Sequence, residues 1–164
     1  MPQRAKMIVD IATGEVEDRE PNARGTMPKL IILKTHPEHL YGVVKEQKHA
    51  LDGKMRGAEE GDLLLIAEIR NPGSAWVRYG MWFVKQRPAK PGESEAIWNG
   101  DSWKYIVEAK GCLELDKSFR PEDEKTSRKS YGQGGTVVYV RDDDADAWRR
   151  KGLLQPLLPP LGSN

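Results

Sequence analysis

Tryptophans are the residues of this sequence that most clearly suggest a binding function. Four of the five lie within residues 61–109: Trp76, Trp82, Trp98 and Trp103. A flat indole face can stack on a nucleobase, and such stacking contributes about 1–3 kcal/mol per base. Tryptophans also fill protein cores, so each has a structural interpretation beside the functional one. Together they predict an aromatic pocket that binds a nucleobase.

Three apolar segments with alternating polarity predict the antiparallel strands that would carry these side chains. Residues 63–69 follow a Gly-Asp pair, and residues 75–84 follow an Asn-Pro-Gly-Ser turn at 71–74. Residues 103–109 form the third segment. The second segment has two faces: Val77, Tyr79, Met81 and Phe83 on one, and Trp76, Arg78, Gly80 and Trp82 on the other. Apolar residues on both faces favour a closed barrel or a covered sheet.

Further elements flank these strands. Residues 29–34 predict a short buried strand, and residues 136–140 predict the last strand. Pro37 suits the start of a helix and Gly53 suits its end. Its apolar face would hold Leu40, Val43, Val44, Ala50 and Leu51. Residues 142–151, acidic first and basic last, match the dipole of a second helix.

This order predicts an α+β fold, a small mixed or antiparallel β-barrel flanked by short helices. Residues 86–95 are expected to form a mobile loop, and residues 116–135 a polar loop. The domain would span residues 28–152, between a flexible N-terminal tail (1–27) and a C-terminal tail (153–164).

The composition limits the class of protein. The chain has 164 residues, of which 38% are hydrophobic and 31% charged, as expected for one soluble globular domain. A formal charge of +1 argues against an undifferentiated polyanion binder but allows a local basic groove. The single cysteine, Cys112, indicates a reducing compartment. There is no apolar run of about 18 residues and no N-terminal signal core, so we expect a cytoplasmic protein without membrane contact.

The order of these elements resembles the PUA-like superfamily and, within it, the EVE domain, which is related to the YTH domain. The resemblance covers roughly residues 30–151. Its features are the strand at 30–34 that runs into a helix, the Gly61-Asp62 pair before an apolar strand, the hairpin at 69–80, and Trp98 ahead of the strand that begins at Trp103.

The sequence departs from the YTH pattern at one point, which distinguishes the EVE and YTH domains here. A YTH domain has a second cage tryptophan in or near the helix after the opening strand, whereas residues 34–61 contain none. Tyr41, His36 or His39 can substitute for it, or the pocket is built as in EVE domains. The departure favours an EVE-type domain.

The resemblance implies a non-catalytic reader of a modified, methylated nucleobase in DNA or RNA, flipped into an aromatic pocket. It implies nucleic acid carrying that base as the partner, a separate effector protein, and neither cofactor nor metal. The expected pocket residues are Trp98, Trp76, Trp103, Trp82, Lys34, Thr35, His36 and Asn71. The expected contacts to the nucleic-acid backbone are Arg56, Arg70, Arg78, Arg128 and Lys129.

Two other functions fit the sequence. Glu108-Ala-Lys110 ends an apolar strand and, with Asp101 upstream, resembles the magnesium-binding core of PD-(D/E)xK nucleases. The hairpin that this family places between the aspartate and the Glu-x-Lys motif is absent. Alternatively, a PUA-like domain whose pocket is filled by its own side chains acts as a protein-interaction scaffold. His36 and His39 lie one helical turn apart, but no third metal ligand stands near them.

Overall fold

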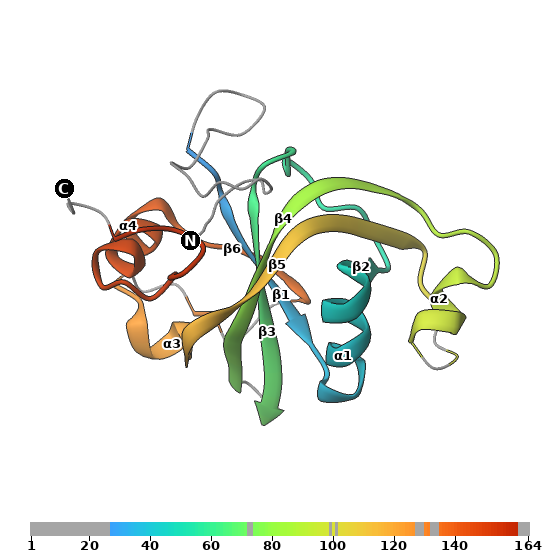
Figure 1. Cartoon of the computed structure of the whole chain (residues 1–164), viewed down its shortest axis with the longest axis horizontal. Helices are drawn as coiled ribbons and strands as arrows, with labels where there is room; N and C mark the ends of the chain where they lie inside the picture. Colours follow the sequence, from blue (N-terminus) through green and yellow to red (C-terminus); the bar gives the residue numbers. More distant parts are fainter. Residues whose placement is uncertain are drawn as a thin grey trace.

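A computed structural model describes residues 27–71, 74–98, 100, 102–126, 130–131 and 135–160. One six-stranded sheet runs through it in the order β2-β5-β4-β3-β1-β6. The strands are β1 (Leu30–Thr35), β2 (Lys48–Leu51), β3 (Leu63–Asn71), β4 (Ser74–Pro88), β5 (Tyr105–Phe119) and β6 (Val137–Tyr139). The helices are α1 (Pro37–Glu46), α2 (Glu93–Ile97), α3 (Pro121–Glu124) and α4 (Asp142–Arg150). The sheet curls into a half-barrel with short helices beside it, which confirms the predicted fold class (Figure 1).

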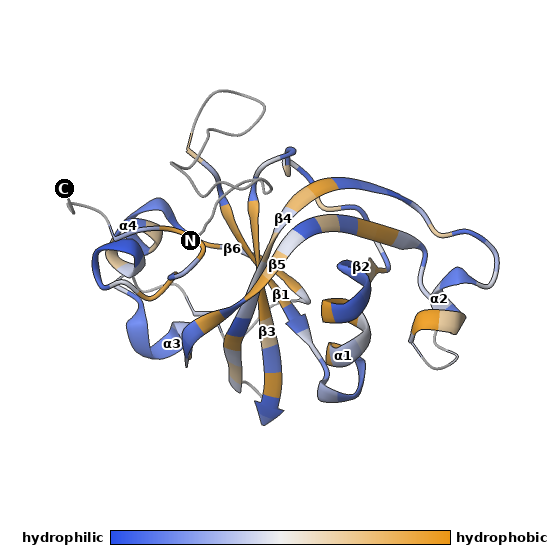
Figure 2. Cartoon of the chain, in the orientation of Figure 1, coloured by the Kyte–Doolittle hydropathy of each residue, from blue (hydrophilic) through white to orange (hydrophobic). Residues whose placement is uncertain are grey.

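Both faces of the sheet are covered, as the apolar patterns predicted. Ile32 of β1 belongs to a cluster with Trp148 of α4, whereas its neighbour Ile31 belongs to a second cluster with Val43 of α1. Hydrophobic residues lie along the central strands, and hydrophilic residues make up much of the helices (Figure 2). β1 and β3 pair in parallel, with α1 and β2 in the connection between them, and all other pairs are antiparallel.

The Gly-Asp pair before β3 fixes the start of that strand. Gly61 has φ of 95°, a backbone conformation that favours glycine there. The carboxylate of Asp62 is fully buried and accepts hydrogen bonds from the backbone amides of Lys29 and Glu59, at 3.0 and 2.9 Å. Asp62 thus links the residue just before β1 to the loop that precedes β3.

A bulge changes the faces of β4. Ile66 pairs with Tyr79 and Ala67 with Val77, so Arg78 is an extra residue on β4. Val77 therefore packs in the cluster with Trp148, whereas Met81 packs on the opposite side with α1. The prediction that Val77 and Met81 share a face was wrong, because alternation does not persist across a bulge. The hairpin itself is confirmed by the pairing of Asn71 with Ser74; the turn residues between them lie outside the described residues.

The predicted first helix was too long. It ends at Glu46 because Gln47 adopts a left-handed conformation with φ of 51°. The Gln47 side chain accepts a hydrogen bond from the Cys112 amide at 2.8 Å, and its backbone oxygen accepts one from the Ala109 amide at 3.0 Å. These contacts with β5 stabilise the left-handed residue, and the chain continues as β2.

Two predicted loops also contain regular structure. β4 continues to Pro88 and α2 begins at Glu93, both inside the segment 86–95 that was expected to be mobile. β5 continues to Phe119, and α3 follows it, within the segment expected to be a polar loop. The sequence patterns missed these extensions because their side chains are largely polar.

The packed body continues past residue 152. Leu154, Leu157 and Leu158 are buried in the cluster with Trp148. A Cβ atom at Gly80 would stand 2.2 Å from Leu157 Cδ1, so the segment after α4 lies directly on β4. Within the described residues, no helix is long and apolar enough to cross a membrane.

Candidate functional site

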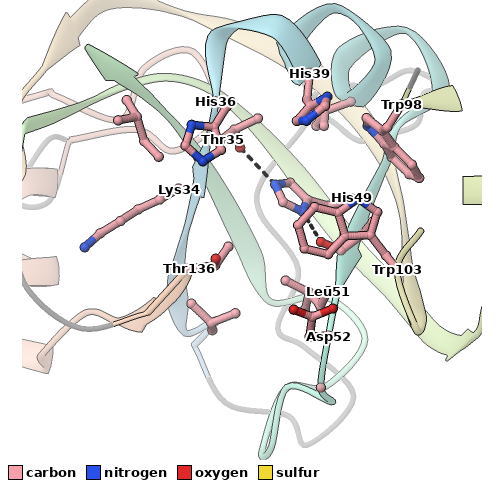
Figure 3. A pocket seen from close by; sticks show the side chains of 15 residues that line it. Lys34, Thr35, His36, His39, His49, Leu51, Asp52, Trp98, Trp103 and Thr136 are labelled. Atoms are coloured by element: carbon pink, nitrogen blue, oxygen red, sulfur yellow. Dashed lines mark hydrogen bonds between the residues drawn. The ribbon is translucent and has the colours of Figure 1, made fainter. Parts of the chain in front are cut away.

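A cavity of about 300 Å³ opens beside α1, where the ends of β1 and β2 meet the connection between α2 and β5 (Figure 3). Its lining includes all three histidines of the chain, two tryptophans and two residues of opposite charge: His36, His39, His49, Trp98, Trp103, Lys34 and Asp52. Thr35, Thr136 and several aliphatic residues complete the lining. The volume lies at the lower end of the range for small-molecule sites.

Thr35 and His49 form the polar part of the wall. Thr35 Oγ1 lies 2.9 Å from His49 Nε2 and 3.2 Å from the Leu33 oxygen, and His49 Nδ1 lies 3.1 Å from the Ala50 oxygen. Both side chains are buried. Burial lowers the pKa of His49 to about 4, with a smaller lowering by the charge of His39, against the hydrogen bond to Ala50. The imidazole is therefore neutral at neutral pH.

The two tryptophans contribute unequally. Trp98 is only 2% exposed because α1 covers it: a Cβ at Gly42 would stand 3.5 Å from its Nε1 atom. Trp103 is half-buried, and its ring stands beside His49 and above Asp52 in the view of Figure 3. Trp103 thus offers more indole surface to a ligand than Trp98 does.

Arg87 of β4 holds α2, the helix that precedes Trp98. Its guanidinium donates to both carboxylate oxygens of Glu93 at 2.8 and 2.6 Å, and to Glu108 of β5 at 2.6 Å. These hydrogen bonds lower the pKa of both carboxyl groups. Next to Glu93, the Ser94 hydroxyl accepts a hydrogen bond from the Trp103 amide at 3.1 Å. One ion-pair network therefore fixes the aromatic side of the cavity.

The mouth carries charges of both signs. Asp52 is exposed at the end of β2, and no described residue forms a hydrogen bond or ion pair with its carboxylate. Lys34 lies on the other side of the cavity from Asp52 (Figure 3). Partial burial lowers the pKa of Lys34, an effect opposed by the charge of Glu122.

Comparison with solved structures gives the fold. The chain is similar to the crystal structure of ASCH from Zymomonas mobilis, with a TM-score of 0.51 and 7% sequence identity over 73% of this chain and 92% of that one. Structures of two mutants of that protein align with the same TM-score, over 71% of this chain. The chain has the fold of ASCH domains. ASCH domains have a PUA-like fold, so the predicted fold is confirmed, while membership of the PUA-like superfamily and of its EVE or YTH branch stays a prediction. No protein-family model and no curated protein matches the chain.

Five of the eight predicted pocket residues line the cavity of this ASCH-like fold: Lys34, Thr35, His36, Trp98 and Trp103. The other three do not line it. Trp76 lies under the Arg70 guanidinium, 4.8 Å from the ring centroid, and Trp82 packs against Gly111 of β5. Asn71 ends β3 at the hairpin. The predicted strand that carries Trp76 and Trp82 is confirmed as β4. Neither tryptophan, however, lines the cavity beside the connection between α2 and β5.

The arginines predicted to contact phosphates are largely engaged with carboxylates. Arg70 and Arg78 both donate to Glu68 Oε1, at 3.1 and 3.4 Å. Arg56 is exposed, and its backbone oxygen accepts a hydrogen bond from the Tyr139 hydroxyl. Arg128 and Lys129 lie outside the described residues. Arg56 is thus the described arginine of this group with an exposed guanidinium and no ion pair to a described residue.

The residues of the nuclease hypothesis are placed only in part. Glu108 accepts a hydrogen bond from Arg87, and Lys110 is exposed on β5. Asp101 lies outside the described residues. Across the described part of the chain, no three acidic, histidine or cysteine side chains are grouped to hold a metal ion.

Sequence reasoning missed three polar residues of the cavity: His49, Asp52 and Thr136. His49 and Asp52 fell inside the segment that was predicted to be helical. The available signal was the grouping of all three histidines, His36, His39 and His49, within fourteen residues. The helical spacing, however, placed His49 on the wrong element.

Proposed function

We propose that this chain binds nucleic acid and holds a nucleobase, flipped out of its strand, in the cavity between α1 and Trp103. The observation that carries the proposal is the pairing of a half-exposed indole with a buried polar wall in a cavity of about 300 Å³. A flipped base needs a flat apolar surface for stacking and fixed polar groups for its edge. Trp103 offers the first, and Thr35 with His49 offers the second.

The finer part of the proposal is that the base is modified, with a methyl group as the simplest case. A methyl group favours a site with little room for water, and Trp98, Val43 and Ile69 give the cavity apolar lining for it. The domain would read the base without catalysis, as EVE-type domains do, in DNA or RNA. Any effect on the nucleic acid would then come from a separate effector protein.

Phosphates next to the flipped base would approach the cationic side of the mouth. Lys34 and His36 stand there, opposite Asp52. Phosphate contacts position a strand without reading its sequence and weaken as salt is added. Binding that depends on both the base and the salt concentration would fit this arrangement.

Tryptophan fluorescence titration tests the proposal. The probes are short DNA and RNA strands, unmodified or carrying methylated adenine or modified cytosine. We expect one modified strand to quench strongly, and Trp103→Ala to weaken that binding about 5- to 100-fold through lost stacking. Trp76→Ala is the matched control, since Trp76 lies outside the cavity lining. Equal, salt-sensitive quenching by every strand, unchanged in Trp103→Ala, would contradict base binding.

One observation favours a second candidate, hydrolysis of an acylated ligand. When the His49 proton is on Nδ1, the Thr35 hydroxyl donates to Nε2, which is how a hydroxyl nucleophile meets its base. Against it, Thr35 is 3% exposed and a pKa of about 4 makes His49 a weak base. Release of p-nitrophenol from p-nitrophenyl acetate, lost in Thr35→Val but kept in Trp76→Ala, would support the hydrolase.

A further inference from the structure

We infer that Asp52 selects the base: it favours a base whose edge presents an amino group and rejects one whose edge is dominated by carbonyl oxygens. This inference rests on the proposed function and names the ligand class of the same cavity. It assigns a specificity role to a residue outside the eight that the sequence patterns selected.

The position of Asp52 is the first argument. Asp52 is exposed and lines the same cavity as Trp103, on whose ring a base would stack, and it lies below that ring in the view of Figure 3. Thr35 and His49, the polar groups deeper in the cavity, also bond each other and the backbone, so they form a fixed polar wall that leaves few positions for a base edge. Asp52 has no such partner among the described residues, so its oxygens are available to a ligand.

The chemistry of a carboxylate is the second argument. An ionised carboxylate only accepts hydrogen bonds. Adenine and cytosine offer exocyclic amino groups, and guanine offers an N–H beside an amino group, which a carboxylate can accept together. Thymine and uracil place their one N–H between two carbonyl oxygens, whose lone pairs repel a carboxylate.

Charge at the mouth is the third argument, because it orients the ligand. A phosphate near Asp52 would meet a like charge, whereas the opposite side carries the Lys34 ammonium. The base edge therefore lies toward Asp52 and the sugar–phosphate toward Lys34. Methylation of an amino group once leaves one N–H for Asp52, and a second methylation leaves none.

The test uses single-stranded DNA pentamers with abasic flanks and one central base, titrated by tryptophan fluorescence. The central base is adenine, N6-methyladenine, N6,N6-dimethyladenine, cytosine or thymine. Since Asp52 is exposed, we expect adenine, N6-methyladenine and cytosine to bind about five- to tenfold more tightly than thymine and dimethyladenine. In Asp52→Asn, whose amide also donates, the preference over thymine should fall to about twofold or less.

Asp116→Asn is the matched control, because Asp116 is exposed on β5 and does not line the cavity. It should keep the wild-type preference. Trp103-dependent binding of all five pentamers with equal affinity would overturn the role of Asp52 and leave base binding intact. A preference that persists unchanged in Asp52→Asn would do the same. Absence of Trp103-dependent binding to any pentamer would overturn both the base-binding function and this inference.

Discussion

At the residue scale, the neutral Thr35–His49 pair has two polar protons for three hydrogen-bonding contacts. The neutral pair has one hydroxyl proton and one ring proton, yet it makes contacts with each other, with Leu33 O and with Ala50 O. A protonated imidazole would satisfy all of these contacts as a donor at both nitrogens. Burial opposes that charge more strongly, which is why the pKa of His49 falls rather than rises.

The lowered pKa of His49 predicts a loss of stability in acid. In the unfolded chain a histidine binds its proton near pH 6.5, whereas His49 in the fold binds it only near pH 4. The unfolded state therefore takes up more protons between these values. The stabilisation is present above pH 6.5 and is lost as pH falls toward 4, by on the order of 3 kcal/mol in total.

Urea denaturation at pH 7.5, 6.5 and 5.5 measures this slope. His49→Gln should unfold more easily at pH 7.5 but lose the part of the pH dependence that lies above pH 5, where few carboxylates titrate. His36→Gln is the control, because His36 is exposed. An equal slope in wild type and His49→Gln would show that His49 is not the group responsible.

At the scale of elements, α2 depends on Arg87 more than on its own sequence. A helix of five residues is too short to be stable alone. We expect Arg87→Ala to lower the free energy of unfolding by about 1–3 kcal/mol, because it leaves Glu108 without its hydrogen-bonded cation and Glu93 with Lys48 alone.

The same change should alter the near-ultraviolet circular dichroism of the tryptophans, since α2 positions Trp98. Arg87→Lys should recover only part of the stability because an ammonium cannot bind two carboxylates in a planar fork. Arg56→Ala serves as the comparison, since Arg56 is exposed and forms no ion pair with a described residue. Wild-type spectra and stability in Arg87→Ala would refute a positioning role for the network.

Elements with one clear pattern were predictable, and elements fixed by tertiary contacts were not. Residues 29–34 and 63–69 are short, apolar and bounded by turn residues, and they became β1 and β3. The segment at 48–51 also fits a helical period, but Gln47 ends the helix through contacts with β5. Nothing local marks glutamine for a left-handed conformation, so β2 and its cavity residues were missed.

The candidate site divides in the same way. Residues at the end of β1 were found because a strand leading into a Pro-started helix places them at a corner. Trp98 and Trp103 were found because aromatic residues flank a loop. Trp76 and Trp82 were wrongly expected in the pocket, because the sequence does not show which part of the fifteen-residue strand β4 lies beside the cavity. Asp52 has no sequence signal that separates it from other exposed aspartates.

At the scale of the whole molecule, the segment after α4 completes the core. Leu154 has no exposed surface and packs in the cluster with Trp148. Leu154→Ala should lower the free energy of unfolding by about 2–5 kcal/mol. Leu113→Ala is the matched control, since Leu113 is 43% exposed on β5 and should change stability by less than about 0.5 kcal/mol. Similar midpoints in guanidinium for both variants would mean that this segment does not support the core.

The pairing of β1 with β6 bears on how the protein is made. β6 and the leucines after α4 leave a ribosome after β1 to β5, yet they cover the outer edge of β1 and one face of the sheet. Until residue 139 has passed the exit tunnel, a nascent chain carries β1 with an open edge and an uncovered apolar surface. Synthesis therefore exposes an aggregation-prone intermediate, and early termination of translation would release it.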